Sequence, residues 1–349
     1  MSLQLDVRSF SLPLRQPLRT AQRIFSTREG GILRLMDEKG CEGFGEVCPL
    51  PGFSREGWED SLAALKALGE QPSWEELARL PAHLECLHGA VTAARRMLEQ
   101  QASLQESEGT AKEASSPPPA AWPMAALLPA GRAVLSKIDR RLELGFRVFK
   151  WKVGVGSLGD EVALLDDLLS RMPAGARLRL DANGAWDRRQ AERWLERCAE
   201  RPIEHVEQPI DPGHRGADDL LLGLANDYPT PLALDESLVG DGDISAWSEK
   251  GWPGVFVVKL SLLAKPQQIL ANLARAQTKV VFSSALETAV GARNALELAF
   301  SWPGERRALG FGVWPLFQEM AFNGPHAAPF LHWGDVQALD RKKVWTALA

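Results

Sequence analysis

Short apolar runs alternate with longer amphipathic segments through most of the chain after residue 121. The runs have the length of buried strands, and the segments between them are long enough for helices. Strands and helices that alternate at this spacing predict parallel βα units, which can close into a barrel. We expect strands over 122–128, 149–153, 178–183, 205–209, 232–237, 255–260, 279–285 and 308–313, and helices over 131–144, 159–171, 187–201, 215–226, 265–277 and 288–300.

The first hundred residues follow another pattern. Alternating apolar positions over 3–12 and 31–48 predict β-structure, and apolar residues at helical spacing predict helices over 55–69 and 83–100. The stretch 16–29 between the strands is basic and polar. We expect it to be either an exposed loop or a mobile flap whose basic groups, Arg28 among them, meet an anionic substrate.

These patterns divide the chain into two domains. An α+β capping domain occupies 1–103 and is completed by the tail, about 318–349, which we expect to pack back on it. Residues 104–120 are polar and then proline-rich, as in a linker or an insertion. Residues 121–317 form the barrel, which is the catalytic domain.

Charged residues stand at or near the C-terminal ends of several apolar runs. Lys150 and Lys152 are two residues apart in one strand, so both leave the same face. Such a pair can simply protect an edge strand from aggregation. The following runs change the interpretation, because strand C-termini meet on one face of a barrel, where barrel enzymes keep their chemistry. The residues that would meet there are Lys150, Lys152, Asp181, Glu207, Asp235 and Lys259.

Composition agrees with a globular enzyme. The chain has 349 residues and a net charge of −5, which gives no support to nucleic-acid binding. We find no apolar run of the roughly 18 residues that a membrane helix needs, and no basic and apolar start typical of a signal peptide. The four cysteines lack zinc spacing. We therefore expect a cytoplasmic enzyme with a small-molecule substrate and no nucleic-acid or membrane partner.

The chemistry follows from the types of residue at the strand ends. Three carboxylates without histidine or cysteine suit a hard cation, Mg²⁺ or Mn²⁺, rather than zinc. A desolvated lysine beside another cation can act as a base, and Lys150 supplies that cation for Lys152. A metal can hold a substrate carboxylate and stabilise the enediolate that forms when its α-proton leaves. The single tyrosine, Tyr228, stands in a turn before a proline, so a tyrosine acid or base is not expected.

The order of these motifs resembles the enolase superfamily, in its muconate-lactonising subgroup. The motifs are Lys150-Trp151-Lys152, Asp181 in Asp-Ala-Asn, Glu207 in Glu-Gln-Pro, Asp235 in Asp-Glu-Ser, and Lys259. Within the subgroup the chain most resembles the o-succinylbenzoate synthase family, through 45–56, 180–183 and 282–288. Two features depart from that pattern: Gln208 stands where relatives often have Glu, and 104–120 looks like an insertion.

The resemblance implies a (β/α)7β TIM-like barrel with an N-terminal capping domain and one Mg²⁺ held by Asp181, Glu207 and Asp235. It implies a lyase reaction of menaquinone or phylloquinone biosynthesis, the syn elimination of water from 2-succinyl-6-hydroxy-2,4-cyclohexadiene-1-carboxylate. Lys152 would be the base and would return its proton to the leaving hydroxide. Lys259 would stabilise the ring of the intermediate as a cation, and Lys150 would tune Lys152 and contact the carboxylate.

Other residues and other functions remain open at this point. Asn183 either binds substrate or supports a metal ligand, and Ser283 and Ser284 are expected to hold the succinyl carboxylate. Glu236 is expected to face away from the metal, and His205 to be structural. The same site suits an N-succinylamino acid racemase or a dipeptide epimerase, which would use both Lys152 and Lys259 as bases. A barrel that binds without catalysis would be expected to lack at least one ligand or lysine, and none is missing.

Overall fold

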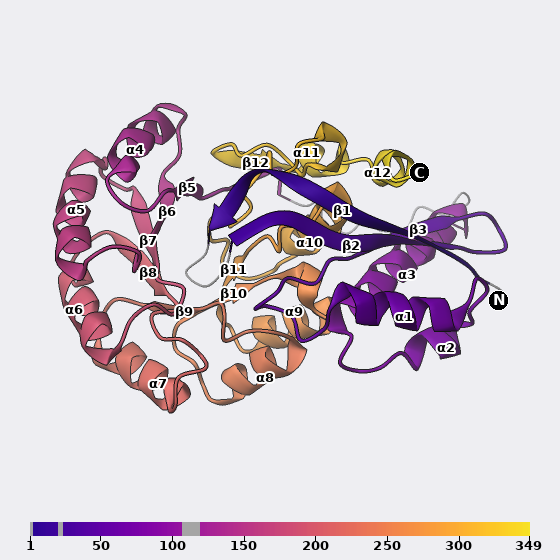
Figure 1. Ribbon diagram of the computed structural model, residues 1–349, viewed down its shortest axis with the longest axis horizontal. Coiled ribbons are helices and arrows are strands. Elements are labelled where there is room, and N and C mark those ends of the chain that lie inside the picture. Colours follow the sequence, from indigo (N-terminus) through magenta and orange to yellow (C-terminus); the bar gives the residue numbers. More distant parts are fainter. Residues whose placement is uncertain (1–2, 20–23, 107–118) are drawn as a thin grey trace.

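The computed structural model describes residues 3–19, 24–106 and 119–349, and its centre is a curved sheet of parallel strands (Figure 1). The sheet order is β11-β10-β9-β8-β7-β6-β5, so each strand lies beside its predecessor in the chain. The predicted parallel βα units are therefore confirmed. The strands are β5 (Ala126–Leu128), β6 (Val148–Lys152), β7 (Arg177–Asp181), β8 (Ile203–Glu207), β9 (Leu232–Leu234), β10 (Val255–Val258) and β11 (Lys279–Phe282).

The predicted eighth strand, 308–313, is only a short bridging segment. Leu309 forms a β-bridge with Met124, just before β5, and Gly310 forms one with Ser283, just after β11. The Gly310 N–H also donates to the carbonyl of Phe282 at 2.8 Å. Because the segment pairs with both edges of the sheet, it closes the barrel without a regular strand.

The predicted first strand, 122–128, is interrupted. Its first part is β4 (Ala121–Pro123), which pairs antiparallel with β12 (Phe330–His332) from the C-terminal segment. Only its second part, β5, belongs to the parallel sheet. The prediction of one continuous strand was wrong because the partner of β4 lies about two hundred residues away in sequence.

Helices cover the outside of the parallel sheet, and Figure 1 shows α4 to α7 as an arc outside the strands that precede them. Alternation along β6 explains this packing: Phe149 and Trp151 are buried on the helical side, where Trp151 meets Trp194 of α6 with ring centroids 6.2 Å apart. Helix α8 was not among the predicted helices. The barrel helices are α4 (Ala133–Glu143), α5 (Leu158–Arg171), α6 (Arg188–Cys198), α7 (Ala217–Asp227), α8 (Asp241–Glu249), α9 (Pro266–Arg275) and α10 (Ala289–Phe300), and the 3₁₀ turn η1 (Leu260–Leu262) follows β10.

The N-terminal part is an antiparallel sheet with helices packed on one side. Its elements are β1 (Gln4–Arg19), β2 (Ile24–Met36), β3 (Glu42–Val47), α1 (Trp58–Leu68), α2 (Trp74–Ala78) and α3 (Glu85–Glu106). Two glycines of β3 allow α3 to approach the sheet closely. A Cβ atom at Gly43 would lie 2.1 Å from the carbonyl oxygen of Ala94, and one at Gly45 would lie 2.0 Å from that of Ala90.

Two expectations about this part were wrong. The stretch 16–29 is mostly strand, because β1 continues to Arg19 and β2 begins at Ile24, with Pro13 opposite Thr27 and Leu18 opposite Phe25. Residues 20–23 lie outside the described residues. Backbone pairing overrode the polar composition of the stretch. The predicted linker begins later than residue 104, since α3 continues to Glu106, and 107–118 are not described.

The C-terminal segment contacts both parts of the molecule. It contains η2 (Met320–Phe322), α11 (Trp333–Gln337) and α12 (Arg341–Ala347), besides β12. Trp345 of α12 packs against Phe44 of β3 with ring centroids 6.0 Å apart, and the guanidinium of Arg8 lies 4.2 Å from its ring centroid. The segment thus joins the N-terminal sheet to β4, the strand that directly precedes the barrel strand β5.

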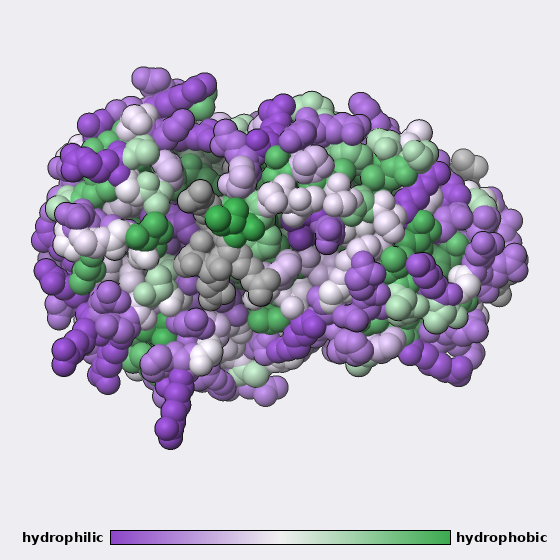
Figure 2. Space-filling view, viewed as in Figure 1, coloured by the Kyte–Doolittle hydropathy of each residue, from purple (hydrophilic) through white to green (hydrophobic). Residues whose placement is uncertain are grey.

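The surface visible in Figure 2 is mainly hydrophilic, with apolar residues scattered among charged ones. In the described part of the chain, we find no helix with the length and apolar character needed to cross a bilayer.

Candidate active site

The six charged residues singled out in the sequence stand at the C-terminal ends of adjacent parallel strands. Lys150 and Lys152 belong to β6, Asp181 ends β7 and Glu207 ends β8, while Asp235 and Lys259 directly follow β9 and β10. The register brings three of them level: Lys152 lies beside Asp181, and Asp181 beside Glu207. Neighbouring residues in register leave a sheet on the same face, so these side chains meet inside the barrel.

Lys150 forms the centre of one ion-pair group. Its Nζ lies 3.0 Å from Asp181 Oδ2 and 2.6 Å from Glu207 Oε1. Burial alone would lower the pKa of Lys150, but the charges of Asp181, Glu207 and Asp235 outweigh burial and raise that pKa. Conversely, burial would raise the pKa of Glu207, but the ammonium of Lys150 holds it well below its usual range. Lys150 is therefore a fixed cation among acids.

Lys259 occupies the other side of the acids. Its ammonium bonds to Asp235 Oδ1 and lies 4.0 Å from the ring centroid of Phe53, which belongs to the cap. Phe53 thus brings the cap into contact with this side of the site. The sequence offered one signal for it, its place in the stretch 45–56 that carries the family resemblance, but no role was assigned to it there.

Lys152 differs from both of these lysines. It is partly exposed, and it has no hydrogen-bond or ion-pair partner within the part of the chain that the structure describes. Its ammonium group is thus available to a ligand, whereas the other two are engaged with carboxylates.

Several buried oxygens at the strand ends lack partners. Asp181 Oδ1, Asn183 Oδ1 and Glu236 Oε2 accept no hydrogen bond from any described residue. Buried oxygens without partners are costly, and a hard cation would satisfy them. No group of three or more His, Cys, Asp or Glu side chains among the described residues has metal-ligand spacing in this arrangement. The ammonium groups of Lys150 and Lys259 take up carboxylate oxygens that a cation would otherwise use.

Glu236 was expected to face away from the metal site, and this was wrong. Its Oε1 accepts a hydrogen bond from Asn183 Nδ2 at 2.8 Å. Burial, and to a lesser extent the nearby charge of Asp181, raises the pKa of Glu236. The turn after β7 explains the contact, because Asn183 adopts φ 45° and its side chain is thereby directed across the strand ends. Asn183 therefore supports a carboxylate beside the site.

The remaining expected substrate ligands are partly engaged elsewhere. Ser284 Oγ donates to Glu287 Oε2 at 2.7 Å and accepts from the Leu286 N–H, so this hydroxyl is committed to its own loop. Ser283 is less constrained, since its hydroxyl makes one long contact of 3.4 Å to the carbonyl of Gly310. Of the two serines, Ser283 is the better placed to meet a ligand.

Arg28 has a structural position that does not support the expected role in substrate binding. The side chain is 2% exposed, and its donors reach the carbonyl oxygens of Pro49 at 2.9 Å, Cys48 at 2.8 Å and Ala285 at 3.3 Å. The guanidinium thereby joins β2 to the loop after β3 and to the loop after β11. The sequence could not reveal this, because the oxygens that accept from Arg28 are all backbone atoms.

His205 is fully buried beside Glu207. Its Nε2 lies 3.9 Å from Glu207 Oε2, and burial lowers the pKa of the imidazole. A neutral buried ring under a carboxylate agrees with the structural role expected from the sequence.

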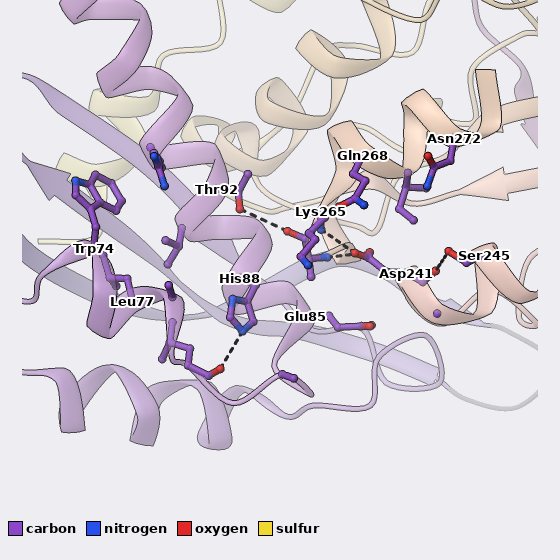
Figure 3. A pocket seen from close by; sticks show the side chains of 18 residues that line it. Trp74, Leu77, Glu85, His88, Thr92, Asp241, Ser245, Lys265, Gln268 and Asn272 are labelled. Atoms are coloured by element: carbon purple, nitrogen blue, oxygen red, sulfur yellow. Dashed lines mark hydrogen bonds between the residues drawn. The ribbon is translucent and has the colours of Figure 1, made fainter. Parts of the chain in front are cut away.

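A cavity of about 730 Å³ lies apart from this site, between α2 and α3 of the cap and α8 and α9 of the barrel (Figure 3). Figure 3 shows Asp241 directed toward the start of α9, where it accepts hydrogen bonds from the N–H groups of Ala264 at 3.1 Å and Lys265 at 2.9 Å. None of the six strand-end charged residues, all of which the structure describes, lines this cavity.

A closed parallel βα barrel, an α+β cap and charged groups at the C-terminal strand ends define a barrel-type α/β enzyme. Comparison with known families refines this class. Residues 133–329, over half of the chain, match the family described as Enolase C-terminal domain-like, and residues 3–76 match the family described as MenC, N-terminal domain. The chain belongs to the enolase C-terminal domain-like family, and the resemblance inferred from the strand-end motifs is confirmed.

Individual relatives agree with this assignment. The o-succinylbenzoate synthase of Thermosynechococcus vestitus is 39% identical over 312 residues, which cover 88% of this chain and 91% of that protein. The crystal structure of o-succinylbenzoate synthase from Thermosynechococcus elongatus BP-1, complexed with Mg in the active site, superposes with a TM-score of 0.78 at 36% identity and 99% coverage of both chains. A hydrophobic dipeptide epimerase from Roseobacter litoralis is 28% identical over 70% of this chain and 72% of its own.

Proposed function

We propose that this protein is an o-succinylbenzoate synthase, a Mg²⁺-dependent hydro-lyase that converts 2-succinyl-6-hydroxy-2,4-cyclohexadiene-1-carboxylate to o-succinylbenzoate in menaquinone or phylloquinone biosynthesis. The identity of 39% over nearly the whole length of one such synthase supports this. The observation that carries the mechanism is the contrast between Lys152, which has no partner among the described residues, and Lys150 and Lys259, which are bound to carboxylates.

Asp181, Glu207 and Asp235 would hold the Mg²⁺ ion. Their all-oxygen chemistry suits a hard cation, and the buried Asp181 Oδ1, which has no partner among the described residues, would be satisfied by one. When bound, the metal supplies positive charge that binds the substrate carboxylate and makes the neighbouring C–H more acidic. Mn²⁺ has the same preference for oxygen ligands and would substitute for it.

Lys152 is the proposed base and acid. Its amine takes the α-proton of the substrate, and the electron pair of the broken C–H bond is first shared with the neighbouring carboxylate. That pair then forms the new ring double bond as the C–O bond to the hydroxyl breaks. The same ammonium then returns the proton to the departing hydroxide, so the elimination is syn and the net loss is one water molecule. A single group on one face of the ring can do both steps because both leaving groups are on that face.

Lys259 and Lys150 act as cations in this proposal. The ammonium of Lys259 lies beside Asp235 and over the ring of Phe53, and we propose that it stabilises the substrate ring in the same way, by charge and cation–π attraction. Lys150, held by Asp181 and Glu207, provides positive charge beside Lys152 and the substrate carboxylate. Asn183 and Ser283 are the proposed polar contacts to substrate, and Ser284 acts through its loop.

A racemase or epimerase of the same family is the second candidate, because a dipeptide epimerase is 28% identical to this chain. Racemisation needs a base on each face of the α-carbon, hence Lys152 and Lys259 in turn. The bond from Lys259 to Asp235 and its position over Phe53 favour a fixed cation there, and so favour elimination.

The four free, buried cysteines agree with a cytoplasmic enzyme.

The decisive test is turnover of the cyclohexadiene substrate by the full chain, followed as the loss of its absorbance, with Mg²⁺ and after chelation. We expect turnover only with metal, and Lys152→Ala should lower kcat by at least about a thousandfold as the proton-transfer group is lost. Lys259→Arg should keep exchange of the α-proton with solvent D₂O. Turnover of N-succinylamino acids in place of the cyclohexadiene would reject the synthase in favour of the racemase.

A further inference from the structure

Gln208 lies directly after Glu207, at the end of β8, and is fully buried. A glutamine amide can donate two hydrogen bonds and accept two. Gln208 uses all four: Nε2 donates to Ile210 O at 2.9 Å and Ser237 Oγ at 2.8 Å, and Oε1 accepts from the N–H groups of Asp235 at 3.0 Å and Ser237 at 3.1 Å. No polar atom of its side chain is left over for a ligand.

These bonds connect the residues that carry the proposed metal ligands. Oε1 of Gln208 holds the backbone N–H of Asp235 itself, so the end of β9 is fixed relative to Glu207, the residue just before Gln208. The backbone of Gln208 extends the connection: its N–H donates to Ala233 O at 2.8 Å, and its carbonyl accepts from Gly184 N–H at 2.7 Å, in the turn after β7. One residue thus ties together three successive strand ends.

The backbone at Gln208 is unusual as well. Its φ is +38°, in the left-handed region that residues other than glycine seldom adopt. This conformation costs free energy and persists only where the surroundings fix it. Here the amide bonds across to β9 supply that fixation, and the turn directs the side chain toward Asp235 instead of along β8.

From this geometry we infer that Gln208 is a positioning residue for the divalent cation: its side-chain oxygen sets the spacing between the carboxylates of Glu207 and Asp235. The inference rests on the proposed function, because it needs a cation held by these acids. Gln208 touches neither metal nor substrate itself. Residues that orient metal ligands typically change metal affinity by 10- to 100-fold when they are replaced.

The test is Mg²⁺ titration of the full chain by calorimetry, with Mn²⁺ binding followed by electron paramagnetic resonance as a second measure. Gln208→Leu removes all four bonds, and we expect its Kd to weaken by about 10- to 100-fold. Gln208→Glu keeps the oxygen that accepts from Asp235 and Ser237, and its Kd should stay within about threefold of wild type. Gln208→Ser, which leaves room for water, replaces the Leu variant if that chain does not fold.

Two controls separate positioning from general stability. Ser237→Ala removes one of the four bonds but leaves both backbone N–H groups on Oε1, so its Kd should be unchanged. Leu221→Ala in α7 creates a cavity in the core away from the site, and it should lower the melting temperature without altering the Kd.

The inference is overturned if Gln208→Leu binds Mg²⁺ as tightly as wild type, or if Gln208→Glu loses as much affinity as Gln208→Leu. If the wild-type chain turns over substrate with Mg²⁺ and the Gln208 variants keep its Kd, only the positioning role fails. A wild-type chain that binds no Mg²⁺ would overturn the proposed function and this inference together.

Discussion

Glu287 gives this protein a pH-dependent stability that can be worked out from its surroundings. The side chain is fully buried just before α10, where its carboxylate accepts from Ser284 Oγ at 2.7 Å and Ser261 Oγ at 3.2 Å. Burial raises the pKa of Glu287 to about 7, from 4.5 for the free group, even though the bond from Ser284 acts in the opposite direction. The nearby charge of Glu46 also raises it.

The sign of the effect follows from which state loses its proton first. As pH rises above about 4.5 the unfolded chain releases the Glu287 proton, while the folded chain keeps it until about pH 7. The free energy of unfolding therefore falls between about pH 4.5 and pH 7 and stays constant above that range. From the two pKa values, the free energy of unfolding should fall by about 2–3 kcal/mol between roughly pH 5 and pH 8.

Glu287→Gln should remove this loss, because glutamine is neutral at every pH in the window. Serine hydroxyls can accept as well as donate, so Ser284 and Ser261 can bond to the new amide. We expect the variant to match wild type near pH 5 and to be more stable by about 2 kcal/mol near pH 8. Equilibrium urea unfolding, followed by tryptophan fluorescence at a series of pH values, measures the difference.

Glu249→Gln, at an exposed position at the end of α8, is the matched control and should give a curve parallel to wild type. If the stability of Glu287→Gln falls with pH as steeply as that of wild type, the assignment of a raised pKa to this buried carboxyl is wrong.

Two further predictions concern packing and a buried ion pair. Gly45→Ala should lower the free energy of unfolding by about 1–3 kcal/mol, because the new Cβ would lie 2.0 Å from the carbonyl of Ala90. The control variant Gly223→Ala, in α7 with open space around it, should raise the free energy of unfolding by about 0.5–1 kcal/mol. Urea unfolding that finds Gly45→Ala more stable than Gly223→Ala would contradict the close packing inferred at Gly45. Arg179→Met should lower the free energy of unfolding by about 3 kcal/mol, because it removes the buried partner of the Glu204 carboxylate. In the wild-type chain Arg179 Nε lies 2.9 Å from that carboxylate. An unchanged melting temperature would contradict this prediction.

The barrel was readable from the sequence because its strands are buried on both faces. Such strands appear as short, continuous apolar runs, and each lies between turn residues and an amphipathic helix. Helix α8 escaped notice since only Ile244 and Trp247 are buried in it, and Asp241 and Gly242 at its start are typical of a turn. One apolar turn within a polar segment does not produce a clear helical period.

Pairing between distant segments could not be predicted. The partner of β4 is β12, and the segment around Leu309 joins Met124 on one side while Gly310 joins Ser283 on the other. Local pattern indicates that a residue is extended but not which strand lies beside it. The same limit applies to β1 and β2, whose polar stretch near Thr27 is a strand because of its partner across the hairpin.

At the candidate site, the sequence predicted which charges gather but not how they pair. Strand direction and the two-residue repeat were enough to bring the six charged side chains to one end of the barrel. The direction of Glu236 was predicted wrongly and Phe53 was given no role, because one depends on the left-handed turn at Asn183 and the other on how the cap lies over Lys259.

The two lysines of β6 show how position along a strand can separate two roles. Side chains in strands lean along the strand direction, so a long side chain reaches beyond its own level. Lys150 starts two residues before the end of β6, level with Arg179, and its ammonium rises to the carboxylates of Asp181 and Glu207. Lys152 starts level with Asp181, and its side chain is partly exposed. The lower lysine is therefore held as a cation between two carboxylates, whereas the upper one has no partner among the described residues, although both belong to the same strand.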